Sequence, residues 1–122
     1  MPNFDLLNLF RHTEGEKHAS GEILFNQGDV GHHMYLIKKG QIALKHGQHI
    51  LETLTEGAIF GEMALIDNEM RSATAQATVD SELIAIDEKR FQFLVSETPF
   101  FAQYVMKVMA NRLRKMNAKV SE

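Results

Sequence analysis

Cysteine is absent from this 122-residue sequence, and long apolar runs are absent as well. The lack of cysteine excludes a disulfide framework, an iron–sulfur centre and a thiolate-ligated zinc site, and it is compatible with a reducing compartment. No apolar stretch reaches the roughly 18 residues that a membrane-spanning helix needs. The start of the chain, Met1–Phe10, lacks the basic residues of a signal peptide. We therefore expect a soluble, cytoplasmic protein without a membrane segment.

A strong excess of one charge is also missing. The net charge is −3, which gives no general case for nucleic-acid binding. Hydrophobic residues make up 44% of the chain, so its length fits one globular domain with a real core. Residues 107–119 are a local exception, with several basic residues and no acidic one. They form either a solvated helix face or a contact for an acidic partner surface, and both interpretations remain open.

Short apolar stretches, separated by turn residues, fill residues 22–87. This texture predicts a closed or double-sheet antiparallel roll. The turns are expected at Gln27–Asp29, Lys39–Gly40, His46–Gln48 and Glu56–Gly57. The expected strands are Ile23–Phe25, Met34–Ile37, Ile42–Leu44, Ile50–Leu54, Thr74–Thr78 and Leu83–Ile86.

Helical patterns flank this central region. Asn3–Arg11 has the spacing of a short amphipathic helix capped by Asn3, and a polar link follows over residues 13–21. Glu88–Ser96 predicts another helix, and Pro99 suits the first turn of a long one over residues 100–119. The long helix carries a narrow apolar stripe of Phe101, Val105, Val108, Met109, Leu113, Met116 and Val120.

The fold class is thus α+β: an antiparallel β-roll of the jelly-roll (double-stranded β-helix) type with helices at both ends. We expect a single domain over residues 1–122. Within it, residues 1–15 form the N-terminal helix and link, residues 16–87 the roll, and residues 88–122 the C-terminal helices.

One segment of the roll carries a specific chemical pattern: FGEMALIDNEMRSATA, Phe60–Ala75. Glu62 can accept hydrogen bonds from a sugar hydroxyl, and Arg71 can pair with a phosphate through two charge-assisted bonds. A glycine followed by a short apolar run suits one helical turn whose free N–H groups face an anion. A ribose that carries a cyclic phosphate needs all three features together.

This segment resembles the phosphate-binding cassette of the cyclic-nucleotide-binding domain family. The resemblance extends to Gly21–Leu44, similar to the first half of that family's β-roll, and to Asp80–Met116, similar to its last strand and closing helices. The long C-terminal helix is most similar to the dimer helix of bacterial catabolite-activator regulators. The chain has no counterpart of their helix-turn-helix, so no DNA-binding domain is expected in it.

The resemblance implies roles for the residues at matching positions. Glu62 would accept hydrogen bonds from the ribose 2′-hydroxyl, and Arg71 would bind the phosphate. Gly61 and Ala64 would offer backbone N–H groups, while the small Ser72 and Ala73 let the backbone approach the phosphate. Phe60, Met63 and Leu65 are expected in the core. The candidate ligand-binding set is Phe60, Gly61, Glu62, Met63, Ala64, Arg71, Ser72, Ala73 and Asn117.

The base side of the site is less fully specified. In this family a threonine after the arginine often accompanies cGMP selectivity, so Ser72 favours cAMP although it still offers a hydroxyl. Catabolite-activator relatives contact the base with polar residues late in the long helix, at positions that match Met116 and Asn117. Asn117 can bond an adenine edge and Met116 can cap it, or Asn117 is an ordinary helix-end residue.

Other chemistries have little support in the sequence. Six histidines raise the alternative of a metal-binding cupin roll, but His32 and His33 are adjacent and would point in opposite directions on a strand. No nucleophile–base pair with an orienting acid appears. We therefore expect no metal site, no cofactor and no enzymatic activity.

The sequence thus predicts a regulatory sensor that binds a cyclic nucleotide reversibly, cAMP in preference to cGMP. The resemblance implies that the phosphate orders the cassette and that the C-terminal helices then repack. A homodimer through the C-terminal helix is expected, although its stripe could instead fold back on the roll. Two rival functions remain: an interaction module that has lost its nucleotide, and a regulatory fragment of a larger transcription factor or ion channel.

Overall fold

The computed structural model describes residues 6–121, and it describes their side chains up to residue 118. The chain divides into two compact units. One contains residues 6–88 and the other residues 89–121, and each is described by itself below. In the described part of the chain, no helix combines the length and the apolar character needed to cross a membrane.

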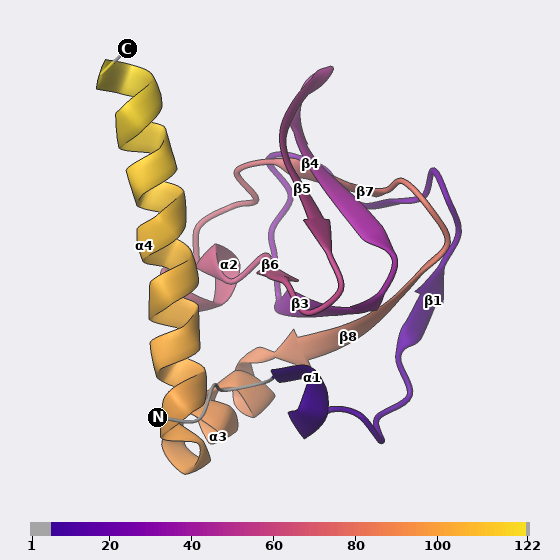
Figure 1. The fold of residues 1–122 in the computed structure, drawn as a ribbon, viewed down its shortest axis with the longest axis vertical. Helices are drawn as coiled ribbons and strands as arrows, with labels where there is room; N and C mark the ends of the chain where they lie inside the picture. Colours follow the sequence, from indigo (N-terminus) through magenta and orange to yellow (C-terminus); the bar gives the residue numbers. More distant parts are fainter. Residues whose placement is uncertain (1–5, 122) are drawn as a thin grey trace. The chain divides into compact units, whose positions relative to one another are not determined.

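Two four-stranded antiparallel sheets build the first unit (Figure 1). One sheet has the strand order β1-β8-β3-β6 and the other the order β2-β7-β4-β5. Chain neighbours thus alternate between sheets except at the β4–β5 hairpin, as in a jelly roll. The strands are β1 (Glu16–His18), β2 (Ile23–Phe25), β3 (His33–Lys39), β4 (Gln41–His46), β5 (His49–Thr55), β6 (Ile59–Phe60), β7 (Thr74–Ala77) and β8 (Ser81–Asp87).

This topology confirms the predicted fold class, and all the predicted strands are present. Two strands were not predicted. Residues 13–21 were expected to be a link, but β1 lies within them and pairs with β8 from Glu16 opposite Leu83. Its Glu-Lys-His sequence has no apolar alternation because it is a solvated edge strand. The two-residue β6 is too short for any periodicity to show.

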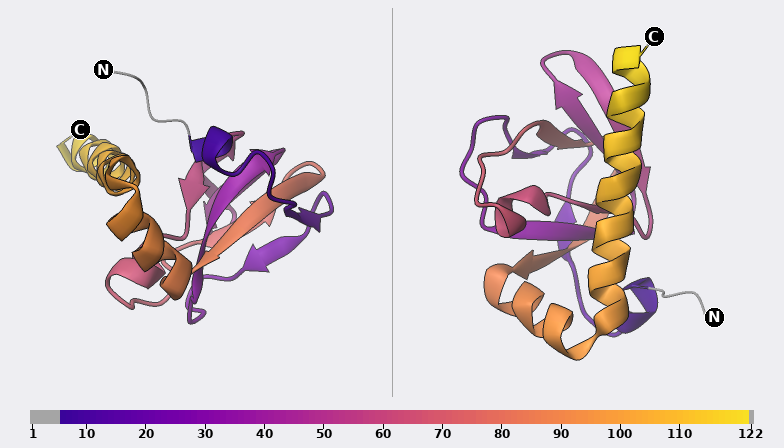
Figure 2. Two further views of the ribbon diagram at one scale, coloured as in Figure 1. Left: turned by 90° about the horizontal axis from the view of Figure 1, so that it is seen from below. Right: turned by 90° about the vertical axis from the view of Figure 1, so that its left-hand side faces the viewer.

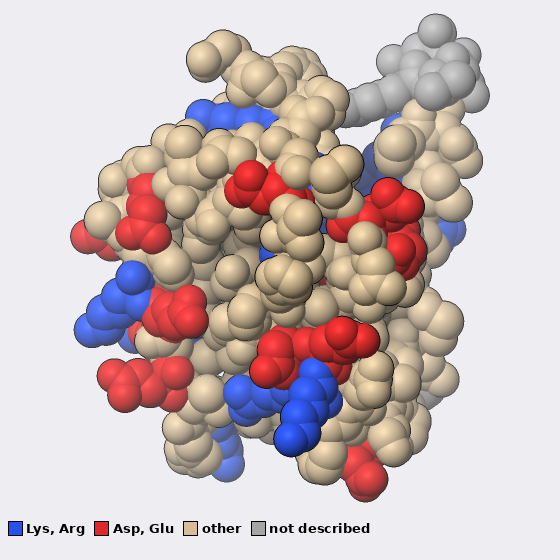
Figure 3. All heavy atoms as spheres, turned by 180° about the vertical axis from the view of Figure 1, so that it is seen from behind, with Lys and Arg blue, Asp and Glu red and all other residues tan. Residues whose placement is uncertain are grey.

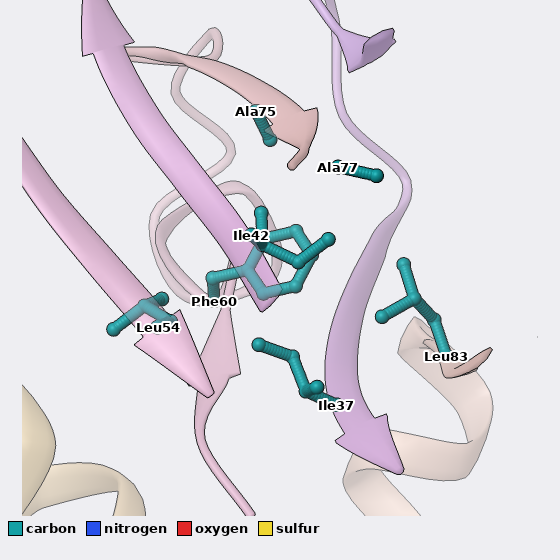
Figure 4. Close-up of a cluster of buried hydrophobic side chains, with 7 residues drawn as sticks. All are labelled: Ile37, Ile42, Leu54, Phe60, Ala75, Ala77 and Leu83. Carbon is teal, nitrogen blue, oxygen red and sulfur yellow. The ribbon is translucent and has the colours of Figure 1, made fainter. Parts of the chain in front are cut away.

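The core of the roll lies between the two sheets, as Figure 4 shows. Ile37, Phe60 and Leu83 come from one sheet. Ile42 and Leu54 come from the other sheet, together with two alanines of β7, Ala75 and Ala77. All seven are buried, and the small alanine side chains leave room for the ring of Phe60 to fill the interior.

Two short helices belong to the roll unit. Helix α1 covers Leu6–Leu9, so the described helix is shorter than the predicted Asn3–Arg11. The proposed cap Asn3 lies outside the described residues. Helix α2 covers Met63–Ile66, between β6 and β7. It is the single helical turn that the cassette sequence predicted.

The second unit contains α4 (Pro99–Ser121) and, except for its first residue, α3 (Glu88–Glu97). Figure 2 shows them as a long and a short helix. The break between them follows from Pro99, which has no N–H to continue a helix. Thr98 closes α3 by donating to the carbonyl of Leu94 at 2.8 Å. The ring centroids of Phe91 and Phe101 lie 5.6 Å apart in an edge-to-face arrangement, which joins the two helices.

Charged side chains of both signs are interspersed on the face drawn in Figure 3. One local pair joins strands of the roll: Lys38 Nζ lies 3.7 Å from Glu82 Oε2. Glu82 also accepts a hydrogen bond from the backbone N–H of Gly15 at 2.9 Å. This carboxylate therefore ties the chain just before β1 to β8.

Candidate functional site

The cassette begins where β6 ends. Gly61 follows Phe60 with a φ of +80°, a left-handed conformation that other residues adopt only under strain. This turn leads through Glu62 into α2, whose first N–H groups cannot find partners within the helix. After α2, Asn68 also has a positive φ of 59°, which asparagine tolerates better than most residues. The chain then reaches Arg71 and, three residues later, β7.

Arg71 is held by main-chain groups from three parts of the roll. Its Nη1 donates to the carbonyl of Gly61 at 2.9 Å, and its Nη2 donates to the carbonyl of His33 at 2.6 Å. The backbone of Arg71 is fixed by the turn after β2. Its N–H donates to the carbonyl of Asp29 at 2.7 Å, and its carbonyl accepts from the N–H of Gly28 at 2.8 Å. The position of this arginine is therefore set before any ligand arrives.

The guanidinium of Arg71 is buried, with 7% of the residue exposed. Burial lowers its pKa, while Tyr35, Glu62 and Asp29 oppose that change by favouring the charged form. Arginine nonetheless stays charged in proteins. Its Nε is buried and finds no hydrogen-bond partner among the described residues. A buried cation with a spare donor is suited to bind an anion.

Glu62 lies at the start of α2 and is 2% exposed. Its carbonyl accepts from the N–H groups of Leu65 and Ile66, both at 3.1 Å, so its backbone forms the first helical turn. Its carboxylate is close enough to Arg71 to favour the charged guanidinium. The two ionisable residues that the sequence singled out therefore lie in one buried site.

The other candidate residues divide into three groups. Phe60 and Leu65 are buried, as expected for core residues, and Ala64 is buried as well. Ser72 is exposed and Ala73 half-buried, beside Arg71 in the chain. The expectation that Met63 lies in the core is wrong, because it is 44% exposed. A four-residue helix can bury only one side, and in α2 Ala64 and Leu65 occupy that side.

Asn117 lies on α4, in the second unit, while the cassette lies in the first. Its part in base recognition therefore stays a prediction.

Sequence reasoning missed the residues that support Arg71 from outside the cassette. The ring of Phe25 lies beneath the guanidinium of Arg71, and the ring centroid is 4.0 Å from Arg71 Cζ. Gly31 lies so close that a Cβ there would be 2.5 Å from Arg71 Cζ and Nε. His33 contributes only its carbonyl, so its residue type gives no signal. The sequence marked Gln27–Asp29 as a turn, but nothing in it indicated that this turn packs against Arg71.

Among residues 6–121, no group of three or more histidine, aspartate or glutamate side chains could hold a metal ion.

Comparison with known families agrees with this geometry. The model of the cyclic nucleotide-binding domain family matches residues 16–98, which is most of the roll together with α3. The chain belongs to the cyclic nucleotide-binding domain family, and the resemblance inferred from the sequence is confirmed.

Similar proteins include receptors and kinase subunits. The cyclic AMP receptor protein of Thermus thermophilus is 34% identical over 108 residues, which cover 84% of this chain and 50% of that protein. The Schizosaccharomyces pombe cAMP-dependent protein kinase regulatory subunit is 39% identical over 79 residues, covering 64% of this chain and 19% of that one. The chain thus spans half or less of the length of these relatives.

Solved structures show the same fold. The crystal structure of the Thermus thermophilus catabolite activator protein matches with a TM-score of 0.79 and 32% identity, covering 87% of this chain and 52% of that one. The EAL enzyme Bd1971 matches in a cAMP-bound form with a TM-score of 0.64 and in a cGMP-bound form with a TM-score of 0.66. Both are 34% identical and cover 30% of the enzyme and 88% or 87% of this chain. This chain is thus a cyclic nucleotide-binding regulatory domain, and similarity alone does not choose between the two nucleotides.

Proposed function

We propose that this chain is a sensor that binds cAMP in preference to cGMP at the cassette of residues 60–75, without chemical change to the nucleotide. The observation that carries the proposal is the buried guanidinium of Arg71, which keeps an unpaired Nε–H beside the carboxylate of Glu62. A cyclic phosphate would satisfy the guanidinium, and a ribose hydroxyl would donate to the carboxylate.

Backbone groups complete the proposed phosphate site. Gly61 has no side chain and Ala64 only a methyl group, so the N–H groups near the start of α2 can approach phosphate oxygens closely. Ser72 and Ala73 are small for the same reason. In this proposal Phe60 and Met63 belong to the binding segment without bonding the ligand through polar atoms, and Phe60 supports the site from the core.

The preference for cAMP rests on Ser72, where a threonine would favour cGMP in this family. Serine and threonine differ at this position by one methyl group. The serine hydroxyl can still reach a purine, but serine lacks the methyl group that restricts the rotamers of threonine. Asn117 is the proposed contact for the adenine edge, from α4.

We also propose that α4 forms a homodimer. Leu113 and Met116 are 58% and 64% exposed, which leaves the C-terminal part of the apolar stripe uncovered in a single copy. A second copy of the same helix would cover it with matching side chains. Because the chain spans half or less of its relatives, it can equally act as the regulatory part of a longer protein, with an output outside these residues.

Calorimetric titration of the chain with cAMP, cGMP and linear 5′-AMP tests the proposed binding. We expect cAMP to bind more tightly than cGMP, and 5′-AMP to bind most weakly because its phosphate is not closed onto the ribose. Binding of cGMP more tightly than cAMP would overturn the preference alone. If neither cyclic nucleotide releases or absorbs heat, and millimolar amounts leave the melting curve unmoved, the interaction module without a nucleotide becomes the better description.

A further inference from the structure

We propose that Phe25 and Gly31, which lie outside the cassette, are positioning residues that hold the guanidinium of Arg71 where it meets the phosphate. The inference rests on the proposed function, since it explains how the phosphate-binding arginine is oriented. It assigns a task to two residues that the sequence pattern of the cassette does not include.

Phe25 acts through the face of its ring. Arg71 Cζ lies 4.0 Å from the ring centroid, a distance at which a cation is attracted to the π electrons. The ring itself is fixed by two others: its centroid lies 6.3 Å from that of Tyr35 and 6.0 Å from that of Phe60. Because Arg71 is buried, this attraction is less screened by water than at a surface. An aliphatic residue could fill the same space but could not attract the guanidinium.

Gly31 matters because there is no room for a side chain at this position. A Cβ at this position would lie 2.5 Å from Arg71 Cζ and Nε and 2.7 Å from the Cβ of Ala64. These distances are shorter than atoms in contact allow, so even alanine would displace the guanidinium or the start of α2. The backbone of Gly31 does not have the positive φ that explains Gly28 and Gly61. Close approach to Arg71 is therefore the reason for glycine here.

Together with the two carbonyl acceptors, these contacts fix the guanidinium before a ligand arrives. Two of its five N–H groups bond the carbonyls of Gly61 and His33, and Nε remains unpaired. A donor that is already oriented loses little conformational freedom on binding, so its position contributes to affinity. Loss of Phe25 or of the space at Gly31 should weaken binding although neither side chain bonds the nucleotide.

The experiment combines cAMP titration with the NMR signal of the Arg71 Nε–H, assigned by its disappearance in Arg71→Lys. In the wild type we expect this signal to be shifted by the ring current of Phe25 and to move again when cAMP binds. Phe25→Leu should lose the first shift and bind cAMP about 2- to 30-fold more weakly, the range of a partly buried cation–π contact. Phe25→Tyr keeps a ring face and should restore both. Gly31→Ala should weaken binding and move the Nε–H signal.

Matched controls separate positioning from general damage. Phe10→Leu makes the same change at a buried aromatic elsewhere in the roll and should leave both cAMP affinity and the Arg71 signal unchanged. Circular dichroism must show a folded roll for each variant, and Phe25→Met replaces Phe25→Leu if the latter does not fold.

Two outcomes would overturn the inference. One is cAMP binding by Phe25→Leu and Gly31→Ala as tight as that of the wild type. The other is an Arg71 Nε–H signal in the free protein that is the same with and without the ring of Phe25. The second comparison needs no ligand, so it still decides the question if the wild type binds no cyclic nucleotide, a result that would count against the proposed function instead.

Discussion

Arg71 Nη2 donates a hydrogen bond of 2.6 Å to the main-chain carbonyl of His33, 38 positions earlier in the chain. His33 is the first residue of β3, and Arg71 lies in the loop before β7. The bond therefore links the cassette to β3, an inner strand of the sheet that does not contain β7. It makes Arg71 a structural residue of the free roll as well as the proposed phosphate ligand.

This double role predicts two effects of Arg71→Ala. Loss of the charge-assisted phosphate bonds should reduce cAMP binding by about 2–4 kcal/mol. Loss of the donors to the Gly61 and His33 carbonyls should also lower the free energy of unfolding, by about 1–3 kcal/mol if those carbonyls stay buried. Calorimetry and urea unfolding measure the two effects separately.

Arg71→Lys should bind weakly too, because lysine lacks the planar fork, whereas Arg11→Lys at an exposed site should change nothing. Wild-type affinity in Arg71→Ala would place the nucleotide elsewhere.

Glu62→Gln should weaken cAMP binding by about 1–2 kcal/mol, because an amide oxygen still accepts a ribose hydrogen bond but without the charge. The matched control is Glu69→Gln, the same change at an exposed position of the same loop, which should bind like the wild type. Titration calorimetry of both variants gives the comparison. Equal losses in the two would mean that Glu62 has no specific contact with the ligand.

Dimerisation through α4 should be lost when charge is placed on its exposed apolar positions. In sedimentation velocity at tens of micromolar, we expect the wild type as a dimer and Leu113→Glu/Met116→Glu as a folded monomer, since burying two carboxylates is costly. Gln103→Glu/Asn111→Glu adds the same charge to α4 away from the stripe and should remain a dimer. A wild type that sediments as a monomer with and without cAMP would remove the dimer, and with it any contact of Asn117 across that interface.

The pH dependence of stability should reflect Glu82. The hydrogen bond from Gly15 N–H, more than the nearby lysines, lowers the pKa of this carboxyl below its ordinary value of 4.5. A folded-state pKa that is depressed gives stability that is present above the unfolded value and lost as pH falls through the folded value. Glu82→Gln should therefore be less stable than the wild type at pH 7, and the difference should be smaller at about pH 4.

Urea unfolding at the two pH values tests this prediction. Glu56→Gln, at an exposed turn, serves as the control. A difference between Glu82→Gln and the wild type that is the same at both pH values would show that the ionised carboxylate is not its cause.

Strong local signals made much of the fold predictable. Strands such as Met34–Ile37 and Ile42–Leu44 stand out because each apolar run is followed, after two polar residues, by a turn glycine. These runs supply the buried Ile37 and Ile42. Pro99 marked the start of α4 because it cannot continue the preceding helix. The solvated edge strand β1 and the two-residue β6 carried no such pattern, and their pairing partners alone define them.

The same division holds for the site. The sequence by itself determined that Gly61, Glu62 and Arg71 occur in one cassette, because their chemistry and close spacing are local. Only the tertiary structure decided what surrounds Arg71. It brought in the ring of Phe25, the bare backbone of Gly31 and the carbonyl of His33. Sheet pairing folds these distant segments onto the cassette, and a carbonyl or a missing side chain acts through its position in space, which no spacing along the chain records.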